Sequence, residues 1–302
     1  MLQEWAAQKR FVLPEPHYFN WLRNQLAQSM FQIFPGYEFV SENGLLAGLE
    51  DFARRESLSI ISLDKVYYSY PPMLEISRMV DAGGNDIGLG ERAGSKPIEE
   101  QLQDLRWQLP SYTKKVALLD DILWTGEVFL FARQLLQNIE IEVVRVYAGI
   151  EIEKFETKEG LRGGQWFREQ TGLEVVSLFS YPEVIDQICE RDFYPGVPLC
   201  GRQVAGLENT GAPYLLPFGN PVKWASIPEW GKLKFSKACL ERTIHLYATI
   251  GRLSGRPVHC EDLGRNIMSL PTGKEPIVEE LERALGGIQE ELDNNARSYI
   301  HY

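Results

Sequence analysis

A short segment near the middle of the chain, residues 116–127, constrains the fold more than any other part of the sequence. Four apolar residues, Val116 to Leu119, run directly into Asp120 and Asp121, and Thr125-Gly126 follows after three intervening residues. A continuous apolar run is typical of a parallel strand covered on both faces. The next segment, Val128 to Leu136, has a helical pattern. The sequence therefore predicts a buried strand that ends in two acids, then a short turn and a helix.

This arrangement suits a sugar phosphate. Carboxylates at the end of a buried strand cost stability, but they can accept hydrogen bonds from hydroxyl groups or bind a metal ion. The first backbone N–H groups of a helix lack an internal partner and carry partial positive charge, which suits a phosphate. The alternative is an ordinary strand-to-helix turn in which Asp121 or Thr125 only caps the helix.

The segment resembles the signature of the type I phosphoribosyltransferases: an apolar strand, two acids, three variable residues, Thr-Gly, any residue, then Thr. The resemblance implies that Asp120 and Asp121 hold the ribose hydroxyls of phosphoribosyl pyrophosphate and share in binding Mg²⁺. It also implies that the loop of Thr125, Gly126 and Glu127 cradles the 5-phosphate. Two positions depart from the family pattern: Glu127 adds a negative charge to an anion-binding loop, and Val128 replaces the second Thr.

Three basic residues are further candidates for contact with the pyrophosphate. The alternating segment 58–66 predicts a strand, which ends in Leu63-Asp64-Lys65, and the resemblance makes Lys65 a candidate. Pro72 to Val80 has a helical pattern. The glycine-rich segment 83–96 predicts a mobile loop, in which Arg92 is a candidate catalytic residue and Lys96 a candidate pyrophosphate contact. A solvated lysine and a plain surface loop are the alternatives.

The order of elements predicts an α/β fold with a parallel sheet flanked by helices. Residues 141–150 form a second apolar strand after the predicted helix, which completes a right-handed βαβ unit. Ligands of such sheets bind beyond the carboxyl ends of the strands, where the two acids lie. We expect an N-terminal cap (1–56), a phosphoribosyltransferase-like core (57–180), and a hood with a helical C-terminal extension (181–302). Within that extension, helices are predicted at 233–253 and 277–292.

Aromatic residues of the hood are candidates for stacking on an acceptor base. They are Tyr194, Phe218 and Trp224, the last two within a segment dense in Pro and Gly. Simple packing is the alternative for each of them.

Composition and charge exclude several classes of protein. The formal net charge of −11 argues against broad binding of nucleic acids, whose footprint is basic. With a polyanionic substrate, an acidic chain needs basic groups or Mg²⁺ at the site. No apolar run approaches the ~20 residues that cross a bilayer. The four cysteines are widely spaced, which argues against zinc, and with no signal-peptide pattern we expect a cytoplasmic protein.

The resemblance implies a transferase of nucleotide metabolism, a pentosyltransferase (glycosyltransferase) that moves phosphoribose from phosphoribosyl pyrophosphate to a nucleobase or amine. Pyrophosphate leaves, and Mg²⁺ is the expected cofactor. No Ser-His-Asp set, HExxH motif or Walker A motif occurs. The alternative is a catalytically inactive protein of this fold that binds a ribose 5-phosphate nucleotide in a regulatory role, alone or as a subunit of a larger assembly. A homodimer is an open alternative for the assembly.

Overall fold

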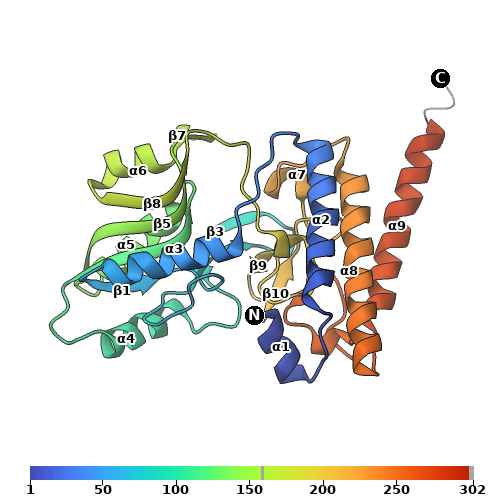
Figure 1. Ribbon diagram of the computed structural model, residues 1–302, viewed down its shortest axis with the longest axis horizontal. Helices are drawn as coiled ribbons and strands as arrows, with labels where there is room; N and C mark the ends of the chain where they lie inside the picture. Colours follow the sequence, from blue (N-terminus) through green and yellow to red (C-terminus); the bar gives the residue numbers. More distant parts are fainter. Residues whose placement is uncertain (158–159, 299–302) are drawn as a thin grey trace. The chain divides into compact units, whose positions relative to one another are not determined.

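Residues 1–157 and 160–298, described by the computed structural model, divide into two compact units (Figure 1). The sheet unit comprises residues 39–78 and 88–185. The helical unit comprises residues 1–38, 79–87 and those from 186 onward. These boundaries differ from the expected division at residues 56 and 180, since residues 39–56 belong with the sheet and 79–87 with the helical unit.

A four-stranded parallel sheet forms the centre of the sheet unit. Its order is β1 (Ser59–Ser62), β4 (Lys115–Leu123), β5 (Glu142–Ile152) and β8 (Glu174–Tyr181), and each neighbouring pair is parallel. The two strands predicted on either side of the central helix are therefore confirmed. The strand predicted at 58–66 is shorter, because only Ser59 to Ser62 pair with β4.

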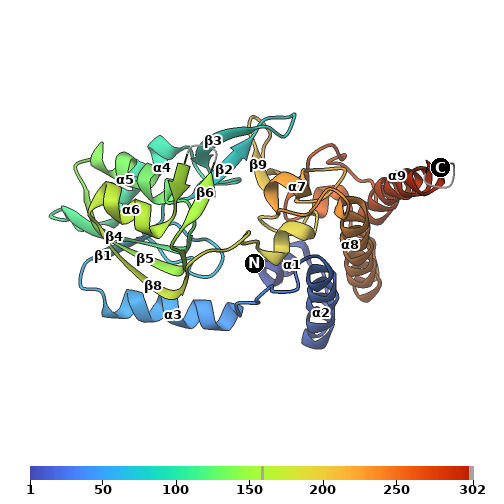
Figure 2. The ribbon, with the colours of Figure 1, turned by 90° about the horizontal axis from the view of Figure 1, so that it is seen from above.

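Helices cover both faces of this sheet (Figure 2). Val116 and Leu118 of β4 pack with α4 (Ile98–Gln108), α5 (Glu127–Gln137) and α6 (Gly164–Thr171) on one face. Ala117 and Leu119, which alternate with them, pack with α3 (Glu42–Arg55) on the other. Because strand side chains alternate between faces, a strand buried on both sides must be apolar throughout. The predicted α/β class is confirmed.

The segment 72–96 differs from its prediction. Ile76 to Val80 form strand β2 and Asp86 to Glu91 form strand β3, joined by a turn in which the Asp81 carboxylate accepts the N–H groups of Gly83 and Asn85 at 2.9 Å. The helix predicted at 72–80 is therefore wrong. Ile76 and Val80 are spaced as on one helical face, but the same spacing also places them on one face of a strand. Within the predicted glycine-rich loop of residues 83–96, Asp86 to Glu91 form strand β3.

A small hairpin follows β5, formed by β6 (Phe155–Thr157) and β7 (Gly160–Arg162).

The helical unit has its own apolar core. Among the helices, α8 (Lys232–Ser254) contributes the most buried side chains to it. Its other helices are α1 (Leu2–Lys9), α2 (Pro16–Ile33), α7 (Pro221–Trp224) and α9 (Ile277–Ser298). Short strands β9 (Arg202–Val204), β10 (Thr210–Ala212) and β11 (Asn266–Ile267) continue a sheet of order β11-β10-β9-β2-β3. The two predicted C-terminal helices are confirmed as α8 and α9. Over the described residues, every helix is too short or too polar to cross a bilayer.

Candidate active site at the carboxyl edge of the parallel sheet

Strand β4 carries both predicted acids toward its carboxyl end. Asp120 and Asp121 precede the last two residues of the strand, Ile122 and Leu123, and α5 begins at Glu127 after a three-residue turn. The predicted order of strand, acids, turn and helix is confirmed.

A third acid, Asp64, joins them from the loop after the neighbouring strand β1. Parallel pairing of β1 with β4 ends at Ser62 and Leu119, and the N–H of Leu63 donates to the carbonyl of Leu119 at 2.8 Å. This register brings the loop after β1 beside the acids of β4. One carboxylate oxygen from each of Asp64, Asp120 and Asp121 lies within 4.8 Å of the others. Three carboxylates at this spacing are suitable ligands for a hard divalent cation such as Mg²⁺.

Burial and mutual repulsion act most strongly on Asp120, whose residue is only 8% exposed. Burial raises the pKa of its carboxyl group well above the ordinary value, and the negative charges of Asp121 and Asp64 raise it further. The Arg92 guanidinium and the N–H of Asp121, which donates to Asp120 Oδ1 at 3.0 Å, act in the opposite direction. A bound cation would replace the proton that this environment favours.

Asp64 also closes its own loop. Its Oδ1 accepts the N–H of Val66 at 2.6 Å, and its Oδ2 accepts the N–H groups of Tyr67 and Tyr68, each at 2.7 Å. The hydroxyl of Ser62 donates to the carbonyl groups of Asp64 and Tyr68. The Asp64 residue is 2% exposed, so these contacts are sheltered from solvent.

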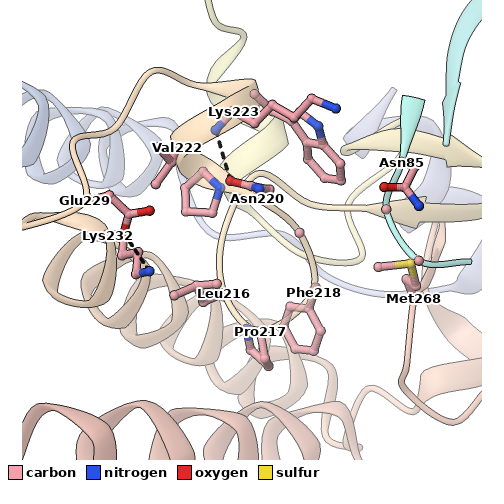
Figure 3. A pocket seen from close by; sticks show the side chains of 15 residues that line it. Asn85, Leu216, Pro217, Phe218, Asn220, Val222, Lys223, Glu229, Lys232 and Met268 are labelled. Carbon is pink, nitrogen blue, oxygen red and sulfur yellow. Dashed lines mark hydrogen bonds and ion pairs between the residues drawn. The ribbon is translucent and has the colours of Figure 1, made fainter. Parts of the chain in front are cut away.

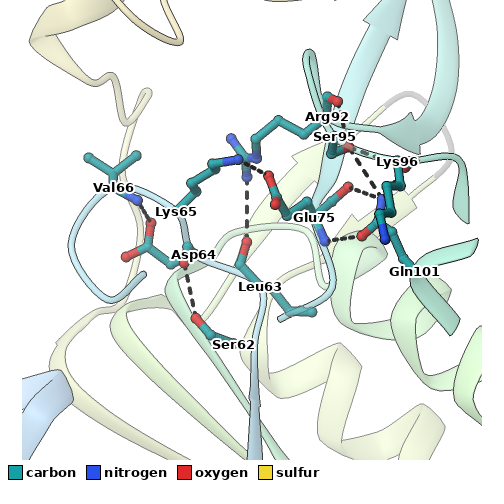
Figure 4. Close-up of polar contacts among 10 residues, drawn as sticks. All are labelled: Ser62, Leu63, Asp64, Lys65, Val66, Glu75, Arg92, Ser95, Lys96 and Gln101. Carbon is teal, nitrogen blue, oxygen red and sulfur yellow. Dashed lines mark hydrogen bonds and ion pairs between the residues drawn. The ribbon is translucent and has the colours of Figure 1, made fainter. Parts of the chain in front are cut away.

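The basic residues of the site are held by a polar network centred on Glu75 (Figure 4). The carboxylate of Glu75 pairs with Lys65, and its carbonyl accepts the N–H of Arg92 at 2.9 Å. Buried Gln101 of α4 accepts the N–H of Glu75 at 2.7 Å and donates to the carbonyl of Lys96 at 2.7 Å. The Arg92 guanidinium donates to the carbonyl of Leu63 at 3.4 Å, next to Asp64. Arg92 is thus held beside the acids from both ends.

The other predicted contacts are placed less centrally. Lys96 is exposed, and its ammonium forms an ion pair of 2.6 Å with Asp104 of α4. Glu127 is exposed at the first position of α5. Lys65 follows Asp64 directly, but its charge is already paired with Glu75.

The turn between β4 and α5 is tightly packed. Gly126 has a φ of +84°, and a Cβ on it would lie 2.9 Å from Cδ2 of the fully buried Phe167. Thr125 is 9% exposed, and its hydroxyl lies 3.4 Å from the N–H of Glu127. Trp124 contacts Phe155 of β6 edge to face, with ring centroids 4.6 Å apart. These contacts hold the turn at the start of α5, where the first backbone N–H groups of a helix lack an internal partner.

A separate pocket of about 370 Å³ lies within the helical unit (Figure 3). Two of the three aromatics proposed for the hood, Phe218 and Trp224, line it together with Lys223 and Lys232. The third, Tyr194, packs in the apolar core instead.

Sequence reasoning missed Asp64, Glu75 and Gln101. Asp64 had a signal: it lies at the end of a predicted strand, as Asp120 and Asp121 do. Its relevance depends on β1 and β4 being neighbours, which the local pattern does not specify. Glu75 and Gln101 gave no signal, because the ion pair of Glu75 with Lys65 and the hydrogen bond from the Glu75 N–H to Gln101 arise only in the folded chain.

Comparison with known proteins gives fold-level similarities of low score. No protein-family model and no curated protein matches the chain. Among solved structures, adenine phosphoribosyltransferase from Thermoanaerobacter pseudethanolicus is 12% identical over 46% of this chain and 79% of its own, with a TM-score of 0.28. UMP synthase from Leishmania donovani is 14% identical over 50% of this chain and 28% of its own, with a TM-score of 0.24. Adenine phosphoribosyltransferase from Leishmania donovani is 16% identical over 49% of this chain and 71% of its own, with a TM-score of 0.25. The α/β fold of this chain accordingly rests on the strand pairing described above.

Proposed function

We propose that this protein is a phosphoribosyltransferase-like enzyme that transfers phosphoribose from phosphoribosyl pyrophosphate to a nucleobase or amine, with release of pyrophosphate. The observation that carries the proposal is the convergence of Asp120 and Asp121 with a tightly fixed helix start at Gly126 and with Arg92. Together they offer acceptors for ribose hydroxyls, backbone donors for a 5-phosphate, and a cation beside the acids.

The proposed reaction asks for little covalent chemistry from the protein. The bond from the anomeric carbon to pyrophosphate breaks, and its electron pair leaves with pyrophosphate. A bond to the acceptor nitrogen forms, and the proton that this nitrogen loses passes to solvent. Positive charge grows on the sugar and negative charge on the leaving group, so positioning and electrostatics determine the rate. Asp120 and Asp121 would hold the sugar, and Arg92 would stabilise the leaving group. Mg²⁺, held by the same acids, would neutralise charge on pyrophosphate.

The experiment is a coupled assay of pyrophosphate release from phosphoribosyl pyrophosphate, with Mg²⁺ and a panel of nucleobases and amines. Acceptor-dependent release that disappears in Asp121→Asn is the expected result. Absence of release with every acceptor, together with retained binding of ribose 5-phosphate, would instead favour the second candidate.

That second candidate is a catalytically inactive protein of the same fold that binds a ribose 5-phosphate nucleotide. A specific observation favours it. In the loop proposed for the phosphate, Glu127 adds a negative charge, and Val128 replaces the threonine that would supply a second hydroxyl ligand. Binding without turnover is its signature.

A further inference from the structure

The outward face of helix α2 is uncharged. On its inward face, Leu22, Leu26 and Met30 are buried in the core of the helical unit, where α2 lies beside α8 (Figure 1). The exposed residues of α2 are all of uncharged types, with histidine counted as neutral: Pro16, His17, Asn20, Trp21, Asn24, Gln28, Phe31 and Gln32. Within Pro16–Ile33 the one charged residue is Arg23, which forms an ion pair of 3.0 Å with Glu190. A surface helix normally carries charged as well as polar residues on its outward side.

Two large aromatic side chains are exposed on this face. Trp21 is 41% exposed and Phe31 is 60% exposed. Neighbouring rings hold Trp21 in place: its ring centroid lies 5.0 Å from that of His245 and 5.6 Å from that of Tyr18. The Tyr18 hydroxyl is in turn hydrogen-bonded to Nδ1 of His245 at 2.7 Å. Tryptophan dominates the energy of many interfaces, and a ring already held in place loses less freedom on binding. Aromatic residues without charges are the composition of an interface core.

The order of residues along this face is self-complementary. Two antiparallel α2 helices can be related by a two-fold axis at the height of Leu26, and such an axis makes an interface in which the same patch meets itself. Residues equally far from Leu26 in opposite directions then lie at the same height on the two helices. The resulting pairs, one residue from each copy, are Asn20 with Gln32, Trp21 with Phe31, and Asn24 with Gln28. Aromatic residues therefore meet aromatic residues, and amides meet amides.

We propose that two copies of this chain form a homodimer by pairing their α2 helices antiparallel. Charge favours a second copy as the occupant: the chain has a net charge of −11, so charged faces of two copies repel each other, and an uncharged face avoids that cost. Asparagine and glutamine side chains both donate and accept hydrogen bonds, so they can pair across the dimer without an ionic partner. One helix face makes a small interface, and the dimer should therefore be weak. The dimer is independent of the proposed function.

Sedimentation equilibrium of the whole chain measures the dimer. The wild-type mass should rise from that of the monomer toward twice that value as the concentration increases through roughly 10–100 μM. Phe31→Glu should weaken association by about tenfold or more, because it removes both aromatic pairs and adds two carboxylates to the contact. Trp107→Glu is the matched control, since Trp107 is 89% exposed on α4 of the sheet unit, and it should associate as the wild type does. A monomeric wild type throughout this range, or equal weakening in the two variants, would overturn the proposal.

Thiol crosslinking tests the register of the two helices. Chains with Asn20→Cys and chains with Gln32→Cys are mixed and treated with a short bifunctional maleimide. The mixture should crosslink efficiently, because these positions of the two copies lie at the same height. Asn20→Cys alone should not, because its two copies lie about 18 Å apart along the helices. Wild-type protein, in which Cys189 is partly exposed, gives the background. Efficient crosslinking of Asn20→Cys to itself, or none above background in the mixture, would contradict the antiparallel pairing.

Discussion

Gly126 and Phe167 approach each other so closely that a Cβ on the glycine would lie 2.9 Å from Cδ2 of the ring. The ring is fully buried and cannot withdraw, and the glycine has a φ of +84°. Both facts fix the turn that leads from the paired acids into α5. These two constraints act at the turn that we propose binds a 5-phosphate.

Gly126→Ala should destabilise the sheet unit by about 2–4 kcal/mol, because strain from the positive φ adds to the clash. Chemical denaturation measures this loss. Gly172→Ala is the matched control: its φ is +66°, but a Cβ there has no neighbour within 4 Å. It should cost only about 1–2 kcal/mol. Equal losses in the two variants would show that Phe167 does not constrain the turn.

Asp120→Asn should raise stability at neutral pH in the absence of divalent cations. The folded state raises the pKa of this carboxyl group through burial and the charges of Asp121 and Asp64, so folding favours its protonated form. Wild-type stability should consequently fall as pH rises from about 4, the unfolded pKa, through the folded pKa. The variant lacks this decline, and at pH 7 its Tm should be higher by roughly 2–4 °C. Parallel curves of Tm against pH for the two proteins would contradict the prediction.

Glu56→Gln should remove a stabilising contribution that is present at neutral pH. Burial alone would raise the pKa of this carboxyl group, but hydrogen bonds from the N–H of Leu58, the Tyr147 hydroxyl and the Arg145 guanidinium lower it from 4.5 to about 2. The stabilisation of the folded state by ionised Glu56 is complete above pH 4.5 and disappears as pH falls toward 2. At pH 7 the variant should lose on the order of 1–2 kcal/mol, after allowance for solvent screening. Denaturation at pH 7 and pH 3 should show the difference shrinking, and a constant difference would refute it.

Arg92→Ala should reduce turnover more than ground-state binding. Its guanidinium lies close enough to Asp120 to lower the pKa of that carboxyl group, and in the proposed reaction negative charge would grow there only as pyrophosphate departs. A loss of roughly 100-fold in kcat with little change in KM is expected. Arg106→Ala, an exposed arginine of α4, serves as the control. A rise in KM at constant kcat would assign Arg92 to uniform substrate binding instead.

The sequence predicted the strand, acids, turn and helix of residues 116–136 because all their signals are local. The apolar run, the adjacent acids and the Gly126 turn each act within a few residues. The segment 72–96 was predicted wrongly for a related reason. Ile76 and Val80 satisfy both helical and strand spacing, and pairing of β2 with its neighbours β3 and β9 decides between them.

The rest of the candidate site depends on which strands are neighbours. Asp64 becomes part of the site only because β1 pairs with β4, and Gln101 only because α4 packs beside the loop of Arg92. Long-range pairing of this kind leaves no local pattern. Lys96 forms an ion pair with Asp104 of α4, and its contact with pyrophosphate stays a prediction.

Calorimetric titration of ribose 5-phosphate with Mg²⁺ into wild-type protein and Asp121→Asn tests the central claim most directly. We expect wild-type binding, weakened in the variant by about 1.5–3 kcal/mol through loss of a charged acceptor for a sugar hydroxyl. Asp51→Asn is the control, since Asp51 lies on α3 and pairs only with the exposed Arg54 and Arg55 among the ion pairs described. Equal affinity in wild-type protein and Asp121→Asn would contradict the role of Asp121, and absence of wild-type binding would contradict the site itself.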